Sequence, residues 1–310
     1  MIEEPNLYQL RILVAVVELG GVGRAAGSMH LSQPAVSAQL RHLRAFAGRP
    51  VLVRDGRRLV LTDAGQALYR YAKETLGATE ALRRTFVDLA QGETDHFLIG
   101  ASPTYATYIL PSILSEFSLS HQTARLTLSL VASREIVDRV RENGMDLGVV
   151  PRSWIPEDLT NELLVADLGH EEWLVIEAAH APFSHGEPLT REELAAIPFV
   201  AAHGRDAFTS GVDPSPFGAH AKKAPVEFGS WEAIKEAVRA GIGVAAVPHS
   251  IVHRELMLGE VRALDIETPR PASTIALICS PQRRRAPITQ VLDELLHYVR
   301  QRVSLALGQE

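Results

Sequence analysis

The 310-residue sequence predicts a small all-α head with a β-hairpin, followed by a larger α/β body of two lobes. Three short helical patterns and a hairpin pattern fill the first part of the chain, and residues 93–310 then alternate strand and helix patterns. The charges also divide the chain. Residues 1–92 hold 12 of the 31 Lys and Arg residues but 8 of the 37 Asp and Glu residues, a net charge of +4, which leaves −10 for the remainder.

The composition indicates folded domains rather than disorder or a membrane protein. Hydrophobic residues make up 46% of the chain and charged residues 22%. The longest apolar runs, such as residues 12–17, fall far short of the ~20 residues that cross a bilayer. The acidic N-terminus MIEEPN lacks the pattern of a secretory signal, and the single cysteine, Cys279, excludes an intramolecular disulfide. We therefore expect a protein of the reducing cytoplasm without a membrane partner.

Three helices are expected at the start of the chain. Apolar residues recur at helical spacing over residues 7–19, and a short Ala-rich segment follows over residues 24–29. The third helix has a good N-cap in Ser32, a proline in its first turn at Pro34, and a terminating glycine at Gly48. Two short helices joined by a tight turn, packed with a third, predict a helix-turn-helix.

The outer face of the third helix and the hairpin after it combine residue types that recognise nucleic acid. Val36, Leu40 and Leu43 form an inward stripe, which leaves Gln, Ser and Arg side chains on the other side. Gln reads adenine, Ser is adaptable, and Arg suits guanine and phosphate. The hairpin turns at Asp55-Gly56 and carries arginines at its tip. A solvated basic hairpin is the alternative. The predicted DNA contacts, around a helix-turn-helix at about 22–41, are Ser32, Gln33, Pro34, Ser37, Arg41, Arg54, Arg57 and Arg58.

A long helix is expected to connect head and body. Thr62 caps an apolar seam that continues at helical spacing over about residues 63–90. A helix of that length with no domain of its own predicts pairing with its copy in a second subunit. Packing against the body of its own chain is the alternative. We thus expect the head at 1–62, the linker helix and hinge at 63–92, and the body at 93–310.

The body begins with a strand–helix–strand–helix–strand pattern, which predicts a parallel sheet. Its first helix is expected to be continuous over residues 103–119, and a later strand is expected over residues 172–177. The chain is expected to cross to a second lobe near Ala166 and to return near Pro269. The lobes are therefore predicted at about 93–166 with 269–310, and at about 167–268.

Two motifs in the head, RAAGSMHLSQPAVSAQLRHL and VLVRDGRRLVLTDAG, closely resemble the N-terminal domain of LysR-type transcriptional regulators. More loosely, GASPTYATYILPSIL and GSWEAIKEAVRAGIGVAAVP resemble family members that control carbon-dioxide fixation or sulfur assimilation. The resemblance covers essentially the whole chain. It implies a winged helix-turn-helix and a linker helix, followed by a two-lobed effector domain like a type 2 periplasmic binding protein.

The resemblance also implies several partners, and the sequence departs from the family pattern in two places. The partners are double-stranded DNA with an inverted-repeat operator, a small-molecule effector, a second copy of the chain in a dimer or tetramer, and RNA polymerase. Dimer and tetramer both remain open. Arg44 stands where the family usually has an acidic residue, and residues 203–225 replace the usual Gly/Ser/Thr loop of the second lobe.

The effector is expected where the strands of the parallel sheet end. Ser102, Pro103 and Thr104 follow the first strand, and Ser133 follows the second. Hydroxyls at helix N-termini, with Arg205 or Arg134 nearby, favour a small anionic metabolite. Alternatively, the two serines merely cap their helices. The predicted effector contacts are Ser102, Pro103, Thr104, Ser133, His203, Arg205 and Thr209.

Rival chemistries have weaker sequence support. The G-x-G-x-x-A at residues 241–246 follows a helix and leads into a strand, the reverse of a dinucleotide-binding motif. His249 and His253 lack a third metal ligand, and Cys279 and Trp231 are expected in the core. The sequence contains neither G-x-S-x-G nor H-E-x-x-H. We therefore predict no catalytic residues, cofactor or metal. The alternative function is a small-molecule-binding protein or enzyme on a binding-protein-like fold.

Overall fold

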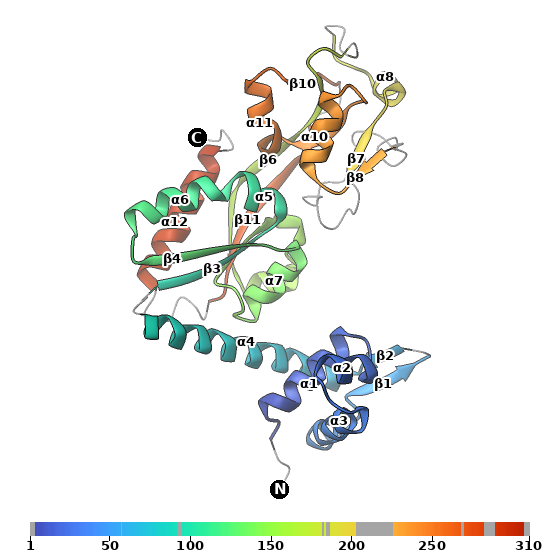
Figure 1. The fold of residues 1–310 in the computed structure, drawn as a ribbon, viewed down its shortest axis with the longest axis vertical. Helices are drawn as coiled ribbons and strands as arrows, with labels where there is room; N and C mark the ends of the chain where they lie inside the picture. The colour runs from blue at the N-terminus through green and yellow to red at the C-terminus, as the bar shows by residue number, and fades with distance from the viewer. Residues whose placement is uncertain are drawn as a thin grey trace. The chain divides into compact units, whose positions relative to one another are not determined.

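The computed structural model describes residues 4–56, 58–91, 95–181, 183, 187–202, 226–267, 270–281 and 289–306. The chain divides into two compact units. The first is formed mainly by residues 1–90, and the second by residues 91–140 and 145–310 (Figure 1). The boundaries predicted from the sequence for domains and lobes stay predictions.

The first unit begins with three helices and a hairpin: α1 Leu7–Glu18, α2 Val22–Ser28, α3 Gln33–Ala47, β1 Leu52–Asp55 and β2 Arg58–Leu61. The predicted caps of α3 are confirmed. The Ser32 side chain accepts a hydrogen bond from the backbone N–H of Ala35 at 3.3 Å. Gly48 ends α3 with a φ of 66°, a left-handed conformation that glycine adopts without a Cβ clash. β1 and β2 pair antiparallel, as the Asp55-Gly56 turn predicts.

Two small hydrophobic cores hold this part together. One contains Leu10, Leu13 and Leu43, and the other contains Ile12, Val16 and Val36. The inward stripe of α3 is therefore confirmed: Val36 and Leu43 are fully buried, and the partly buried Leu40 packs against both cores.

The linker helix α4, Asp63–Gln91, is 29 residues long, as the apolar seam predicts. At 1.5 Å per residue it extends for about 43 Å. Three large hydrophobic side chains in its described part are exposed: Tyr71 (51%), Leu82 (54%) and Phe86 (62%).

The second unit is built on a sheet in the order β10-β6-β11-β5-β3-β4, with β9 also paired to β6. The strands are β3 Asp95–Ala101, β4 Ala124–Leu130, β5 Leu147–Pro151, β6 Leu164–Ala178, β9 Ala245–Pro248, β10 Val261–Ala263 and β11 Ala272–Cys279. β3 pairs in parallel with β4 and β5, so the parallel sheet predicted for the first lobe is confirmed for these strands. β11 runs antiparallel to both β5 and β6, which makes the complete sheet mixed.

Helices cover both faces of the first-lobe sheet (Figure 1). α6, Leu110–Ser120, and α12, Thr289–Ala306, contribute to one hydrophobic core with β3, β5 and β11. α7, Ser133–Arg141, contributes to a second core on the opposite face.

One sequence-based expectation in this unit was wrong, and another was confirmed but too short. The helix expected over 103–119 is two helices, α5 Pro103–Tyr108 and α6, separated at Ile109. Pro111 explains the break, because proline lacks an N–H and its ring clashes with the carbonyl four residues earlier. The strand expected over 172–177 is the 15-residue β6. Its N-terminal half was missed because it pairs with the distant β11.

The second lobe surrounds a separate core. It includes α8 Arg191–Ala196, β7 Val200–Ala202, β8 Val226–Phe228, α10 Trp231–Arg239 and α11 His249–Met257. β6 takes part in both lobes, since Leu168 lies in a first-lobe core and Trp173 lies in the second-lobe core. The register of β6 against β11 shifts at Leu168, between Asp167 and Gly169, whose φ is 146°.

Candidate functional site

The exposed face of α3 carries the residues predicted to read DNA. Gln33, Ser37 and Arg41 are spaced by four residues, so they lie on successive turns of one helical face. Gln33 and Arg41 are exposed and Ser37 is half-buried. Pro34 and the N-cap Ser32 are also exposed. The structure therefore brings these five residues together around the outer side of α3.

The hairpin lies beside α3, and its predicted arginines are described to different extents. Arg54 is exposed on β1 and faces Leu59 in the strand register. Arg58 begins β2 opposite Asp55, and its side chain is not described. Arg57 lies outside the described residues.

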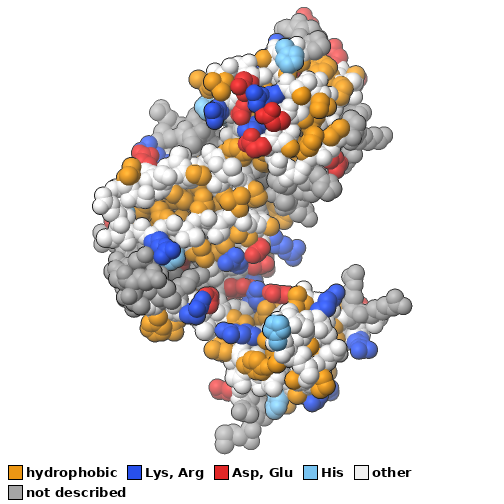
Figure 2. Space-filling view, in the orientation of Figure 1, with side chains coloured by type: hydrophobic (Ala, Val, Ile, Leu, Met, Phe, Trp, Pro, Cys, Tyr) orange, Lys and Arg blue, Asp and Glu red, His pale blue; other side chains and the backbone are white. Residues whose placement is uncertain are grey.

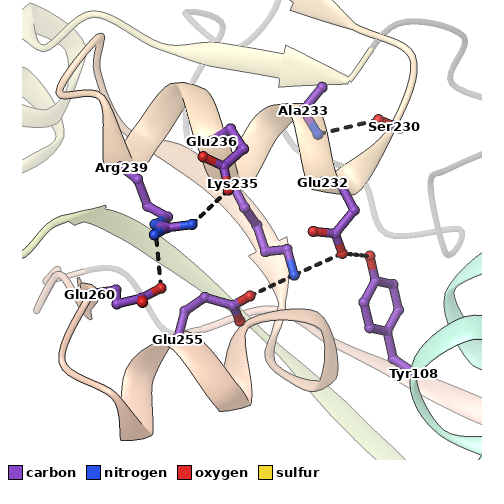
Figure 3. Close-up of polar contacts among 9 residues, drawn as sticks. All are labelled: Tyr108, Ser230, Glu232, Ala233, Lys235, Glu236, Arg239, Glu255 and Glu260. Carbon is purple, nitrogen blue, oxygen red and sulfur yellow. Dashed lines mark hydrogen bonds and ion pairs between the residues drawn. The ribbon is translucent and has the colours of Figure 1, made fainter.

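In the second unit, α5 of the first lobe meets α10 of the second lobe. We call this contact the lobe junction and define it by Thr104 and Tyr108 on α5 and Trp231, Glu232 and Lys235 on α10. The indole Nε1 of Trp231 donates a hydrogen bond to Thr104 Oγ1 at 3.1 Å. Tyr108 Oη donates to Glu232 Oε1 at 2.8 Å (Figure 3). These two side-chain hydrogen bonds join α5 to α10.

Lys235 neutralises the acidic side of this junction. Its side chain is 6% exposed, and Nζ lies 2.9 Å from Glu232 Oε1 and 2.8 Å from Glu255 Oε1. The same Nζ lies 5.2 Å from the centre of the Tyr108 ring, a cation–π distance. In Figure 2, acidic and basic side chains alternate over α10 and α11. A buried lysine with two carboxylate partners is the expected arrangement for a charge removed from water.

The junction also shifts the pKa values of its members. Burial, followed by the hydrogen bond to Glu232, raises the pKa of Tyr108 above its ordinary value. Partial burial opposes ionisation of Glu232, but hydrogen bonds from Lys235 and Tyr108 hold the pKa of Glu232 below its ordinary value. Tyr108 therefore stays a hydrogen-bond donor and Glu232 an acceptor at neutral pH.

The predicted effector residues of the first lobe lie at adjacent strand ends. Ser102 follows β3 and Ser133 follows β4, and both residues are buried. Ser102 occupies the N-cap position of α5 without a side-chain capping bond. Ser133 is the first residue of α7 rather than its N-cap. Within the described ranges, neither serine hydroxyl has a hydrogen-bond partner.

The other predicted effector residues have different settings. Pro103 is the first residue of α5 and is half-buried. Thr104 is 2% exposed, and its hydroxyl oxygen accepts the Trp231 bond described above. His203, Arg205 and Thr209 lie outside the described residues.

Sequence reasoning missed a buried carboxyl group on β6. Glu171 on β6 is 1% exposed and accepts hydrogen bonds from the backbone N–H of Ser250, at 3.3 Å, and from the Ser250 hydroxyl. Its Oε2 is buried without a partner among the described residues, as is Oγ of Ser273, which faces Glu171 from β11. Burial raises the pKa of Glu171 to about 7. The available signal was strand alternation, which places Glu171 on the same face as Trp173.

Lys235 was also missed, although its position in the sequence carried a signal. It lies on the apolar face of α10 together with Trp231, Ile234 and Val238. A lysine on that face must find carboxylate partners or distort the packing. Trp231 itself is 4% exposed and packs edge-to-face with Trp173, which confirms its expected place in the core.

The residues considered for metal or redox chemistry have ordinary surroundings. His249 and His253 form an edge-to-face ring pair with centroids 5.6 Å apart. Cys279 is buried, and its Sγ donates to the carbonyl oxygen of Ser280 at 3.4 Å. Among the described residues, no three His, Cys, Asp or Glu side chains are arranged to hold a metal ion. No helix in the described part of the chain is long and apolar enough to cross a membrane.

Comparison with known proteins decides the family. Residues 7–66 match the family described as bacterial regulatory helix-turn-helix protein, lysR family, and residues 90–301 match the LysR substrate binding domain. The chain belongs to the LysR family of transcriptional regulators. As a LysR regulator it has a DNA-binding helix-turn-helix domain and an effector-binding domain.

Curated relatives match this LysR regulator over most of their length. The probable RuBisCO transcriptional regulator of Trichormus variabilis is 30% identical over 293 residues, covering 93% of this chain and 87% of the relative. That of Guillardia theta is 29% identical over 298 residues, covering 93% of this chain and 94% of the relative.

Solved LysR structures share the fold. CbnR, a LysR family transcriptional regulator, aligns with a TM-score of 0.61 at 20% identity, covering 96% of this chain and 99% of CbnR. LysG from Corynebacterium glutamicum, with bound effector Arg, aligns with a TM-score of 0.57 at 22% identity, covering 96% and 98%. The predicted fold class is confirmed: an N-terminal helix-turn-helix domain precedes an α/β substrate-binding domain.

Proposed function

We propose that this LysR regulator binds an inverted-repeat operator with α3 in the major groove, and that a small anionic metabolite binding between its lobes alters that binding. The observation that carries the proposal is the outer face of α3. Gln33, Ser37 and Arg41 are presented on one face, while Val36 and Leu43 fix the helix through the core behind it. Such a face suits base edges in a groove about 12 Å wide.

An inverted repeat follows from a dimer through α4. The exposed side chains of Tyr71, Leu82 and Phe86 lie on one face, because their spacings of eleven and four residues return to nearly the same helical angle. Pairing with a second copy of α4 removes this apolar surface from water. A two-fold axis then relates two α3 helices and requires two half-sites of opposite orientation. Association into a tetramer and contact with RNA polymerase are further parts of the proposal.

The proposed effector contacts are the hydroxyls of Ser102 and Ser133. Both are buried at neighbouring strand ends and lack partners among the described residues, so they are available to donate to a ligand. α7 begins at Ser133 and offers unpaired backbone N–H groups, and the exposed Arg134 adds a positive charge. These donors favour a carboxylate, phosphate or sulfate-like group.

Selection of DNA from a random pool tests the operator proposal. The full-length protein should enrich duplexes with two inverted half-sites, and protection from hydroxyl radicals should cover both halves. Because two relatives are described as probable RuBisCO transcriptional regulators, promoter DNA of RuBisCO genes is the first natural fragment to test. Absence of any enriched sequence, or a concentration-independent monomer in sedimentation, would contradict the proposal.

A further inference from the structure

The polar face of α3 continues beyond the residues proposed to read bases. Arg44 follows Gln33 by eleven residues, so it lies within about 20° of the same helical direction. Both side chains are exposed. Arg44 also belongs to the last turn of α3, where a positive charge complements the C-terminal end of the helix dipole. That role alone does not account for the surface around it.

Two hollows of the first unit meet at Arg41 and Arg44. The first hollow, of about 260 Å³, lies between α3 and the hairpin, where Ser37 and Leu40 of α3 face Leu52 and Leu59 of the strands. The second, of about 480 Å³, lies at the end of α3 and is lined by Arg41, Arg44, Ala45, Gly48, Arg49 and Pro50. The left-handed turn at Gly48 brings Arg49 beside the two helical arginines.

This arginine cluster, which we define as Arg41, Arg44 and Arg49, has no compensating acidic group in the part of the chain that the structure describes. All three residues are exposed, and none forms an ion pair with any residue that the structure describes. The sequence has no Asp or Glu between Glu18 and Asp55, a stretch of 36 residues that contains five arginines. An uncompensated cluster of guanidinium groups around a hollow is suited to a phosphate group.

The length of α3 places this cluster outside the groove. Eleven residues at 1.5 Å each put Arg44 about 16 Å along the axis from Gln33, whereas the major groove is about 12 Å wide. A helix that reads bases with its N-terminal turns therefore reaches the sugar-phosphate backbone with its C-terminal turn. Phosphate contacts there position the protein and carry no sequence information.

We propose that Arg44 and Arg49, together with Arg41, clamp a backbone phosphate that flanks the bases read by α3. This contact rests on the proposed function and adds a second binding site on the same domain. It strengthens binding to every DNA sequence equally and does not contribute to discrimination between bases. Arg41 belongs to both sites, because it lies one turn after Ser37, which is proposed to read bases, and one turn before Arg44.

Salt dependence of DNA binding tests the clamp. Fluorescence anisotropy would measure the affinity of full-length protein for a 40-base-pair duplex selected from a random pool and for its scrambled counterpart, in KCl from 50 to 300 mM. The variants are Arg44→Ala, Arg49→Ala and their double. Arg44→Lys with Arg49→Lys preserves the charge, and Arg11→Ala on the exposed side of α1 removes one charge outside both hollows.

The clamp predicts that the slope of log K against log[KCl] becomes shallower by about 0.9 for each phosphate that the variant no longer neutralises. Both duplexes should be affected alike, so the ratio of their affinities should stay within twofold of wild type. The Lys variant and Arg11→Ala should keep the wild-type slope. Circular dichroism melts of each variant verify folding, and the Lys variant serves as the folded reference if an alanine variant melts early.

Two results would overturn the inference while leaving the proposed function intact. In the first, the double alanine variant keeps the wild-type slope, which would limit Arg44 and Arg49 to surface roles. In the second, the affinity ratio between the two duplexes collapses, which would make them base readers. Failure of the wild-type protein to select any duplex would instead contradict the proposed function itself.

Discussion

Tyr108→Phe tests whether the lobe junction stabilises the effector-binding unit. The change removes only the hydroxyl, which donates to Glu232 across the lobes at 2.8 Å, and leaves the ring over Lys235 in place. Glu232 keeps Lys235 as a partner at 2.9 Å, so no carboxylate is left buried and unpaired. The variant therefore measures one inter-lobe hydrogen bond.

The magnitude follows from the exposure of the two partners. A hydrogen bond to a charged group contributes about 1.5–3 kcal/mol when it is well buried. The Glu232 side chain is 64% exposed and Tyr108 is half-buried, so water replaces part of the interaction that the hydroxyl made. We expect a loss of about 1 kcal/mol in the free energy of unfolding, which is about a fivefold change in the equilibrium.

Tryptophan fluorescence in urea is the assay, because all three tryptophans, Trp154, Trp173 and Trp231, belong to the second unit. A double-mutant cycle with Glu232→Gln should give a coupling energy of about 1 kcal/mol. Tyr71→Phe, which removes an exposed hydroxyl from α4, is the matched control and should not change this transition. A coupling energy within about 0.3 kcal/mol of zero would refute the assignment of the junction as a stabilising contact.

Three further predictions concern the packing of α3, the pKa of Glu171 and the effector contacts. Leu43→Ala should destabilise the DNA-binding domain by about 2–5 kcal/mol, because it removes a fully buried side chain. Phe46→Ala, on the exposed side of α3, should cost under about 0.5 kcal/mol in the same circular dichroism melts. Equal losses of stability in the two variants would contradict the inward stripe of α3. Because burial raises the pKa of Glu171 from 4.5 to about 7, the folded state binds this proton more tightly than the unfolded state, and stability should fall as pH rises from about 4.5 to 7. In urea unfolding, the free energy of unfolding of the wild-type protein should fall by on the order of 3 kcal/mol between pH 4.5 and 8, and Glu171→Gln should lack this fall. An unchanged pH dependence in the variant would exclude Glu171 as its source. Ser102→Ala and Ser133→Ala should abolish the response of DNA binding to whichever anionic metabolite binds in a calorimetric screen, with basal DNA binding unchanged. A wild-type response would place the pocket elsewhere.

Local signals were sufficient to predict the DNA-binding domain. The extent of α3 follows from Ser32, Pro34 and Gly48, residues whose caps and backbone preferences act within one turn of the helix. The inward and outward faces of α3 follow from helical spacing alone. The parallel pairing of β3, β4 and β5 was predictable because β3 and β4 are each followed by helices that return the chain to the edge at which the next strand begins.

Contacts between distant segments could not be predicted in the same way. Tyr108 and Glu232 are 124 residues apart, so their pairing depends on how the two lobes fold together. Lys235 and Glu255 are 20 residues apart on two helices of the second lobe, so their pairing depends on how α10 and α11 pack. The first half of β6 pairs with β11, about a hundred residues later, and no local pattern indicates that register. The break at Ile109 is different, because its cause, Pro111, is local, although the continuous apolar pattern on both sides of it favours a single helix.

Discrimination between DNA sequences by Gln33 and Ser37 tests the central claim most directly. Affinities of wild type and of the double variant Gln33→Ala, Ser37→Ala would be measured for the selected operator, for single-base mismatches and for a scrambled duplex at one salt concentration. The proposed base-reading role predicts a loss of discrimination of about 1–3 kcal/mol for each residue, with affinity for the scrambled duplex retained. Undiminished operator affinity and selectivity in the double variant would contradict it.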